Sequence, residues 1–250
     1  FTDDDVIVTP NWTAELARVL DETGAEAVNG LVLPVRLDTP AQRLFQVELN
    51  CFEANPLPMT FDRAWVEAHT RQAAPVWRLG AGANMAFTRR AFERSGLFDE
   101  RLGAGRSGCS EDSEMWRRII EDGGRVAYDP RAVVLHEHRE TLKELYGQTR
   151  AYTRGHVSAL FVQHRAYRRW GDAKRIWLSL PRYFARLGVT ALKFDQPARY
   201  RLAREELIGW LEGLAWLARD RTPITPELPP RESSRLTPEV NAQETTFRAA

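Results

Sequence analysis

The spacing of apolar positions changes several times along the chain, and each change marks a predicted element. Residues 12–22 have apolar side chains at helical spacing and end before Gly24, a typical stop signal for a helix. Residues 27–35 are rich in Val and Leu, as a buried strand is. Residues 111–122 form the best-marked helix, because its apolar side chains make one stripe: Met115, Trp116, Ile119 and Ile120.

Shorter elements are expected between these. Residues 76–87 are predicted to form a strand interrupted by glycines, and residues 88–95 a short helix. Two short strands are expected over 125–128 and 132–135. Residues 36–76 contain several prolines and are expected to form a loop-rich insertion with one or two short helices.

The second half of the chain is predicted to be helical and basic. Between Arg150 and Arg221 there are 15 Lys or Arg against 6 Asp or Glu, with Trp, Tyr and Phe interleaved. We expect residues 141–221 to be a helical extension, for which two interpretations are about equal. It is either a set of basic amphipathic helices lying in an anionic membrane interface or a bundle packed on the core. Residues 222–250 are polar and proline-rich, and are expected to be a disordered tail.

Composition narrows the class of protein only slightly. A net charge of +1 over 250 residues gives no signal for nucleic-acid binding. No window approaches the roughly 18 consecutive apolar residues of a transmembrane helix. The two cysteines have no metal-binding or redox spacing, which fits a reduced, cytoplasmic compartment. Residues 1–3 look like the end of a strand, so we expect the chain to begin inside a longer sequence.

Three consecutive aspartates lie between Phe1-Thr2 and an apolar run. Asp3 and Asp5 are two residues apart, and carboxylates so placed after a strand can hold Mg²⁺ or Mn²⁺ together with substrate phosphates, or can contact a ribose. A solvated acidic turn is the alternative interpretation of the same residues.

A second acidic pair opens the helix predicted over 111–122. Ser110 is expected to be its N-cap, which leaves Glu111 and Asp112 in the first turn, where the helix dipole favours negative charge. Ordinary helix capping explains this pattern. An ionised carboxylate in this position is also suited to act as a general base. The preceding loop, 97–110, is rich in glycine and would allow a substrate to approach the backbone closely.

Two histidines alternate at the end of the last predicted strand. By strand periodicity His136 and His138 should point to the same side, where a neutral imidazole can complete a carboxylate metal site. A surface or hydrogen-bonded pair is the simpler explanation. Arg139 adds a cation that can contact a phosphate.

Taken in order, these motifs resemble the second half of a family 2 glycosyltransferase. The segments that carry the resemblance are FTDDD (1–5), GAGANMAFTRR (80–90), GLFDERLG (96–103), SEDSEMWRR (110–118), YDPRAVV (128–134) and HEHR (136–139). Each segment is short, but their order and spacing make the match specific. The resemblance covers about residues 1–140, and the remainder resembles the helical extensions of some bacterial members only loosely.

The resemblance implies a fold and a set of site residues. The fold would be a partial GT-A, Rossmann-like mixed sheet with flanking helices, without the N-terminal nucleotide-binding units. Asp5 would be the most direct metal ligand and Asp3 would lie nearer the nucleotide, with Asp4 beside them. His136 would reach the metal, with His138 as the alternate.

The resemblance also implies a reaction. Asp112 would be the catalytic base, Glu111 would position the acceptor hydroxyl, and Asn84 would lie near the sugar donor or acceptor. Family members use a nucleotide-diphosphate sugar with Mg²⁺ or Mn²⁺ and invert the anomeric centre in one displacement. The acceptor would be a polysaccharide, an envelope glycan or a lipid-linked glycan. The enzyme would then be cytoplasmic, with peripheral contact to the inner face of the plasma membrane.

Two other classes of function remain open from the residues alone. A metal-dependent phosphohydrolase can also begin with an aspartate pair after a strand, although Ile7 and the absence of a placed Lys disfavour a phosphoaspartyl mechanism. A non-catalytic, membrane-associated interaction module would use only the basic helices.

Overall fold

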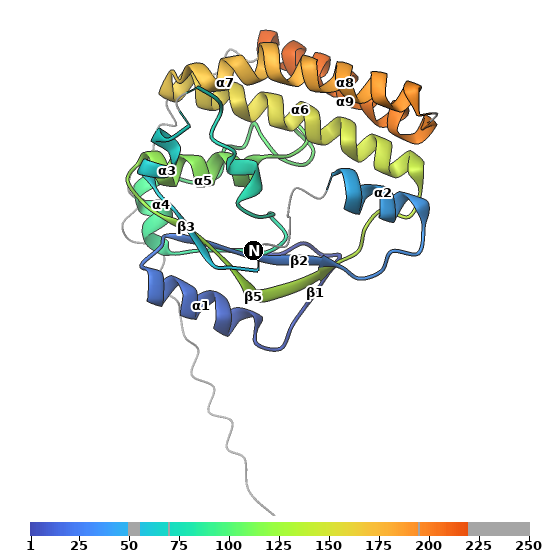
Figure 1. Ribbon diagram of the computed structural model, residues 1–250. Coiled ribbons are helices and arrows are strands. Elements are labelled where there is room, and N and C mark those ends of the chain that lie inside the picture. The colour runs from blue at the N-terminus through green and yellow to red at the C-terminus, as the bar shows by residue number, and fades with distance from the viewer. Residues whose placement is uncertain (50–55, 70, 195, 220–250) are drawn as a thin grey trace, which may run out of the picture.

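The computed structural model describes residues 1–49, 56–69, 71–194 and 196–219 (Figure 1). A curled mixed sheet lies in the middle of the molecule, with α1 on one face and a layer of long helices on the other side. The architecture confirms the expected fold class, a mixed α/β sheet with flanking helices and C-terminal helices, consistent with a partial GT-A fold. The predicted tail, 222–250, lies outside the described residues.

Five strands form the sheet. They are β1 (Val6–Val8), β2 (Ala27–Pro34), β3 (Met59–Phe61), β4 (Met85–Phe87) and β5 (Val126–His136). The strand order is β1-β5-β2-β4. Strand β3 also pairs with β5, near its start at residues 126–128, whereas β1 pairs near its end at residues 134–136. Only β2 and β5 run parallel to each other; β1, β3 and β4 are antiparallel to their neighbours.

Two predictions about strands were wrong. The strands expected over 125–128 and 132–135 are one continuous strand, β5, whose register against β2 shifts at Gly30. The long strand expected over 76–87 contains a 3₁₀ turn, η1 (Val76–Arg78), and only β4 is extended. The reason is close packing: a Cβ at Gly80 would lie 2.4 Å from the Asn29 Cβ, so the chain here is a turn pressed on β2.

The two faces of the sheet bury different helices. α1 (Trp12–Thr23) packs Leu16 and Val19 on one face, against Val28 and Ala127. The opposite face carries the main core, centred on α5 (Glu111–Glu121) with its buried Met115, Trp116, Ile119 and Ile120. The remaining short helices border this core: α2 (Pro40–Glu48), α3 (Arg63–Glu67) and α4 (Arg89–Ser95).

The helical extension is a bundle packed on the core. It consists of α6 (Leu142–Tyr167), α7 (Trp170–Lys174), the π-helical turn η2 (Arg175–Ser179), α8 (Leu180–Lys193) and α9 (Pro197–Arg219). Val157 and Leu160 of α6 share one buried cluster with Leu180 and Phe184 of α8. None of the helices in the described part of the chain is both long and apolar enough to cross a membrane.

The bundle also holds the glycine-rich loop that precedes α5. A Cβ at Gly108 would lie 2.4 Å from the Ala151 carbonyl oxygen, and a Cβ at Gly155 would lie 2.5 Å from the Cys109 nitrogen. Loop and helix therefore approach each other backbone to backbone. This contact fixes the start of α5, where the acidic pair is located.

Candidate active site

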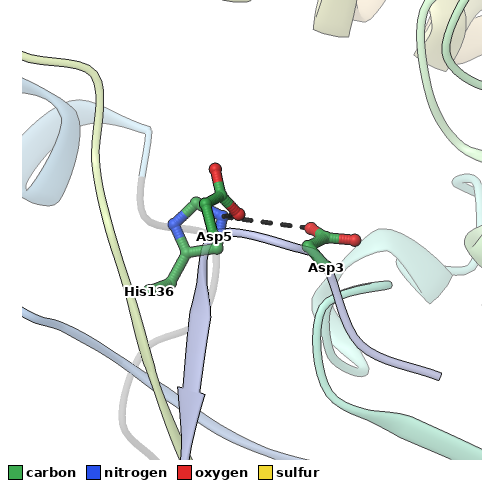
Figure 2. A group of neighbouring side chains, drawn as sticks. All are labelled: Asp3, Asp5 and His136. Carbon is green, nitrogen blue, oxygen red and sulfur yellow. Dashed lines mark ion pairs between the residues drawn. The ribbon is translucent and has the colours of Figure 1, made fainter.

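Antiparallel pairing of β1 with β5 brings two distant motifs together. Val6 lies opposite His136 in the register, so the residue before β1, Asp5, faces the end of β5. The Glu137 amide donates to the Asp5 carbonyl at 3.2 Å and extends this pairing. As a result His136 Nε2 lies 3.4 Å from Asp5 Oδ1 (Figure 2).

Asp3 completes a cluster of three side chains. Its Oδ2 lies 3.9 Å from His136 Nε2, and one ligand atom from each of Asp3, Asp5 and His136 lies within 4.8 Å of the others. The segment is held in place because Phe1 and Met85 exchange two backbone hydrogen bonds, of 2.7 and 3.2 Å. Residues 1–3, which the sequence predicts to be the end of a strand, are not part of a strand; the first strand is β1, from Val6.

The chemistry of the cluster suits a hard divalent cation. Two carboxylates and one imidazole are a donor set used for Mn²⁺ and related metals, with carboxylates preferred by Mg²⁺. The Asp3 side chain is 54% exposed and that of Asp5 is 31% exposed, so the cluster is open on one side to phosphate oxygens. Partial burial and the negative charges of Asp5 and Asp4 raise the pKa of Asp3, while His136 opposes this effect. A bound cation would relieve that repulsion.

Two further predicted residues lie at the margin of the cluster. Arg139 Nη1 is 4.0 Å from Asp5 Oδ2, with its guanidinium about half exposed. Asp4 is exposed and is not part of the cluster of ligand atoms.

His138 does not join the metal cluster, contrary to the sequence-based prediction of an alternate ligand. Strand β5 ends at His136, so the alternation of a strand does not continue to residue 138. The His138 ring is buried, packs on Phe45 with ring centroids 4.4 Å apart, and has Nε2 3.3 Å from Gln46 Oε1. Burial lowers its pKa to about 4, so the imidazole is neutral inside the fold.

Asp112 is positioned by backbone and hydroxyl donors. Its Oδ2 accepts a hydrogen bond from the Gly82 amide at 2.9 Å, and Oδ1 accepts from the amide and hydroxyl of Ser113 at 2.5 and 3.1 Å. Burial raises the pKa of the carboxyl above its usual range, although these hydrogen bonds oppose the shift. A carboxylate with a raised pKa is a better proton acceptor, which is what a general base requires.

Glu111 connects the acidic pair to the aspartate cluster. Burial is the main cause that raises its pKa, followed by the negative charges of Asp112 and, more weakly, Asp3. Glu111 and Asp3 are therefore close enough to interact electrostatically. The Glu111 carboxyl also lies against Gly103, whose φ of +88° and lack of a side chain leave room for it.

Ser110 is at the N-cap position, as the sequence predicts. Its side chain, however, makes no capping hydrogen bond. Ser110 adopts a left-handed conformation with φ of +75°, and its hydroxyl lies 3.0 Å from Cys109 Sγ. The Asp112 carboxylate instead satisfies an amide of the first turn, that of Ser113. Capping and site formation therefore use the same carboxylate.

Asn84 has a structural position in place of the predicted position near the donor or acceptor. It is fully buried, and its Nδ2 donates to the carbonyls of Leu31 and Ala132 at 3.0 and 2.8 Å. Its Oδ1 accepts from Trp12 Nε1 at 2.8 Å. The amide thus bridges β2 and β5 at their register shift, and its polar atoms are used within the fold.

Sequence reasoning missed the Gly82 amide and the Ser113 hydroxyl, which orient Asp112. The Gly-Ala-Gly run at residues 80–82 belongs to one of the family motifs and predicts an interrupted strand, but it gives no indication that the Gly82 amide contacts Asp112. Nothing in the sequence indicated that Ser113 would turn back toward its neighbour.

A family profile and two curated relatives match much of this chain. The profile of the Glycosyl transferase family group 2 matches residues 1–217, so the match includes the helical extension that the sequence motifs did not cover. A pre-mycofactocin glycosyltransferase of two Mycobacterium tuberculosis strains is 28% identical over 169 residues, which is 66% of this chain and 32% of the relative. The chain thus spans about a third of the length of these relatives. With more than half of its residues matched by the family profile, the chain belongs to the family 2 glycosyltransferases.

Proposed function

We propose that the chain carries the catalytic base and the cation-binding residues of an inverting glycosyltransferase. The donor is a nucleotide-diphosphate sugar, as family membership implies, and the acceptor presents a hydroxyl group. The observation that carries the proposal is that one short segment contacts both groups: the Gly82 amide donates to Asp112, and Met85 pairs with Phe1, which leads directly into the Asp3–Asp5–His136 cluster.

The chain's own residues account for the proton transfer. Asp112 accepts the proton of the acceptor hydroxyl, whose oxygen then forms a bond to the anomeric carbon as the bond to the diphosphate oxygen breaks. Because attack and departure occur on opposite faces, the anomeric configuration inverts. Glu111, which precedes Asp112 in the sequence, orients the acceptor in this proposal.

Asp3, Asp5 and His136 would hold Mg²⁺ or Mn²⁺. When bound, the cation supplies Lewis-acid stabilisation of the negative charge on the leaving diphosphate. Arg139, beside Asp5, offers a further positive charge to the phosphates. The buried His138 and Asn84 have no part in this proposal, because their side chains are occupied within the fold.

The acceptor is a glycan or a lipid-linked glycan in this proposal. The name of the Mycobacterium tuberculosis relatives makes pre-mycofactocin a second acceptor to include in any screen. A metal-dependent phosphohydrolase is the competing function, and it predicts cleavage of simple phosphate esters without sugar transfer.

The Asp112→Asn substitution tests the base. It removes the proton-accepting charge and preserves the shape, so transfer from a nucleotide-diphosphate sugar should fall by about 10²–10⁴-fold. Binding of the donor nucleotide in the presence of Mn²⁺ should change little. Activity of the unsubstituted protein should rise with pH as Asp112, whose pKa is raised by burial, loses its proton.

The matched control is Asp122→Asn, at the exposed other end of the same helix. It should leave transfer unchanged. Near-normal transfer by Asp112→Asn, or an equal loss in both variants, would remove Asp112 from the role of base.

A further inference from the structure

Helix α8 has one face packed in the bundle and one face open. Its inner residues Leu180, Phe184 and Ala191 recur at helical spacing and are buried against the neighbouring helices. In Figure 1, α8 lies on the outer side of the helical layer, away from the sheet. Of the two interpretations of the basic segment, bundle packing is therefore correct for the inner face.

The outer face of α8 exposes apolar side chains to an unusual degree. Val189 is 65% exposed and Leu192 is 67% exposed, and Phe194, directly after the helix, is 61% exposed. Trp177, in the turn before α8, is 57% exposed. Such side chains gathered on one helix mark an interaction surface rather than the scattered exposure that is normal for soluble proteins.

Basic residues occupy the same face. Arg182, Arg186, Val189 and Lys193 follow one another at intervals of three or four residues, so they share one side of the helix, and all four are exposed. Within the described part of the chain, Arg182 and Arg186 form no ion pair. No Asp or Glu occurs anywhere in residues 173–194.

The other two cations of this segment, Lys174 and Arg175, contact residues of other elements. Lys174 Nζ donates to the Arg71 carbonyl at 3.0 Å, and the Arg175 guanidinium lies 4.0 Å from the centre of the Trp77 ring. The exposed cations of this segment are therefore Arg182, Arg186 and Lys193, on the same helix as Val189 and Leu192.

We propose that the outer face of α8 docks on the surface of an anionic lipid bilayer. Apolar side chains flanked by Arg and Lys, with no Asp or Glu within residues 173–194 to repel lipid phosphates, are the pattern of a helix that lies in the interfacial plane. Long basic side chains can reach the headgroups while Val189 and Leu192 enter the acyl boundary. A second copy of the chain fits this face poorly, because two-fold pairing would bring its cations against one another.

Flotation of the 250-residue chain with vesicles tests this surface. Vesicles of phosphatidylcholine with 30% phosphatidylserine should bind the protein at low salt, and pure phosphatidylcholine vesicles should bind it far less. Each Lys or Arg near an anionic surface contributes about fivefold in partitioning, so Arg182→Gln with Arg186→Gln should lower binding by roughly 25-fold. Val189→Ser with Leu192→Ser should also lower binding, without loss of the dependence on salt.

The matched control is Arg89→Gln with Arg125→Gln, two exposed arginines outside the helical layer. It removes the same charge and should retain vesicle binding, and circular dichroism should show that all variants keep their helices. Equal loss in the control pair would mean non-specific attraction and would overturn the proposal. So would a concentration-dependent dimer, formed without lipid, that Val189→Ser with Leu192→Ser abolishes.

Discussion

Adjacent aspartates before β1 have different surroundings. Asp5 lies next to His136 and contributes a ligand atom to the cluster, whereas Asp4 is exposed and lies outside it. Both residues lie in the turn before β1, and of the two only Asp5 is directed toward His136 at the end of β5. The two residues therefore offer a comparison in which the charge removed is the same and only the position differs.

Asp5→Ala should weaken the binding of Mn²⁺ alone. Loss of a direct ligand should cost more than about tenfold in affinity, since even changes in residues around the ligands commonly cost 10–100-fold. Electron paramagnetic resonance of free Mn²⁺ during a titration measures this directly. Asp4→Ala is the control and should retain most of the affinity; equal weakening by both substitutions would mean that net charge, and not coordination, attracts the metal.

At the scale of elements, two glycines in α6 have opposite surroundings. A Cβ at Gly155 would lie 2.5 and 2.6 Å from the backbone N and O of Cys109, in the loop that leads to Glu111 and Asp112. A Cβ at Gly147 would meet nothing within 4 Å. Helix propensity favours alanine at both positions, so only the tertiary contact distinguishes them.

Gly155→Ala should destabilise the protein by about 1–3 kcal/mol, because the loop or the helix must move to accept the methyl group. Gly147→Ala should stabilise it by about 0.5–1 kcal/mol. Urea denaturation followed by circular dichroism measures both effects. Transfer should fall in Gly155→Ala, since the displaced loop carries the start of α5, and an unchanged stability in this variant would contradict the close backbone contact.

At the scale of the whole molecule, charged groups connect the helical layer to the rest of the fold. Arg169, before α7, donates to both oxygens of Glu121 in α5 at 2.7 and 2.9 Å. Glu121 also pairs with the fully buried Arg117 at 2.9 Å. The helix that begins with the acidic pair is thus fixed at its other end by the extension. The family profile covers both parts, which agrees with their packing as one structure.

Glu206 of α9 is a buried carboxyl between several elements. Burial raises its pKa to about 8, the negative charge of Glu48 in α2 adds to the shift, and a hydrogen bond from Tyr183 of α8 opposes it. Because the folded pKa exceeds the unfolded value, the stability contributed by the protonated form is complete below about pH 4.5. It is lost as pH rises toward 8, since the unfolded chain ionises first.

Glu206→Gln should remove this loss. Relative to the unsubstituted protein, the variant should gain roughly 2–4 kcal/mol in the free energy of unfolding at pH 8.5 and little at pH 5. Denaturant titrations at the two pH values test this, with Glu205→Gln as the neighbouring control, which should show no such pH-dependent gain. A gain of equal size at both pH values would attribute the effect to packing instead of ionisation.

Local patterns were sufficient for several elements, and the order of motifs was sufficient for the family. The helices at 12–23, 89–95 and 111–121 and the strand at 27–34 follow from helical spacing, Val and Leu runs and glycine stops, which depend on nearby residues alone. The sequence predicts Asp3, Asp5 and His136 as possible metal ligands, but no local pattern predicts that they lie close together.

Only tertiary structure decided which candidates share a site. Pairing of β1 with β5 joins Asp5 to His136 across more than a hundred residues, and the end of β5 at His136 turns His138 into the core. At the shift in register near Gly30, the Asn84 side chain is hydrogen-bonded to the backbone of the sheet. Close contact with α6 fixes the loop before Asp112. Sequence by itself determined the family, the main helices and the chemical type of the candidates, because these depend on residue identity and short-range spacing. Their meeting in space depends on strand pairing and close packing between distant segments, which no local pattern encodes.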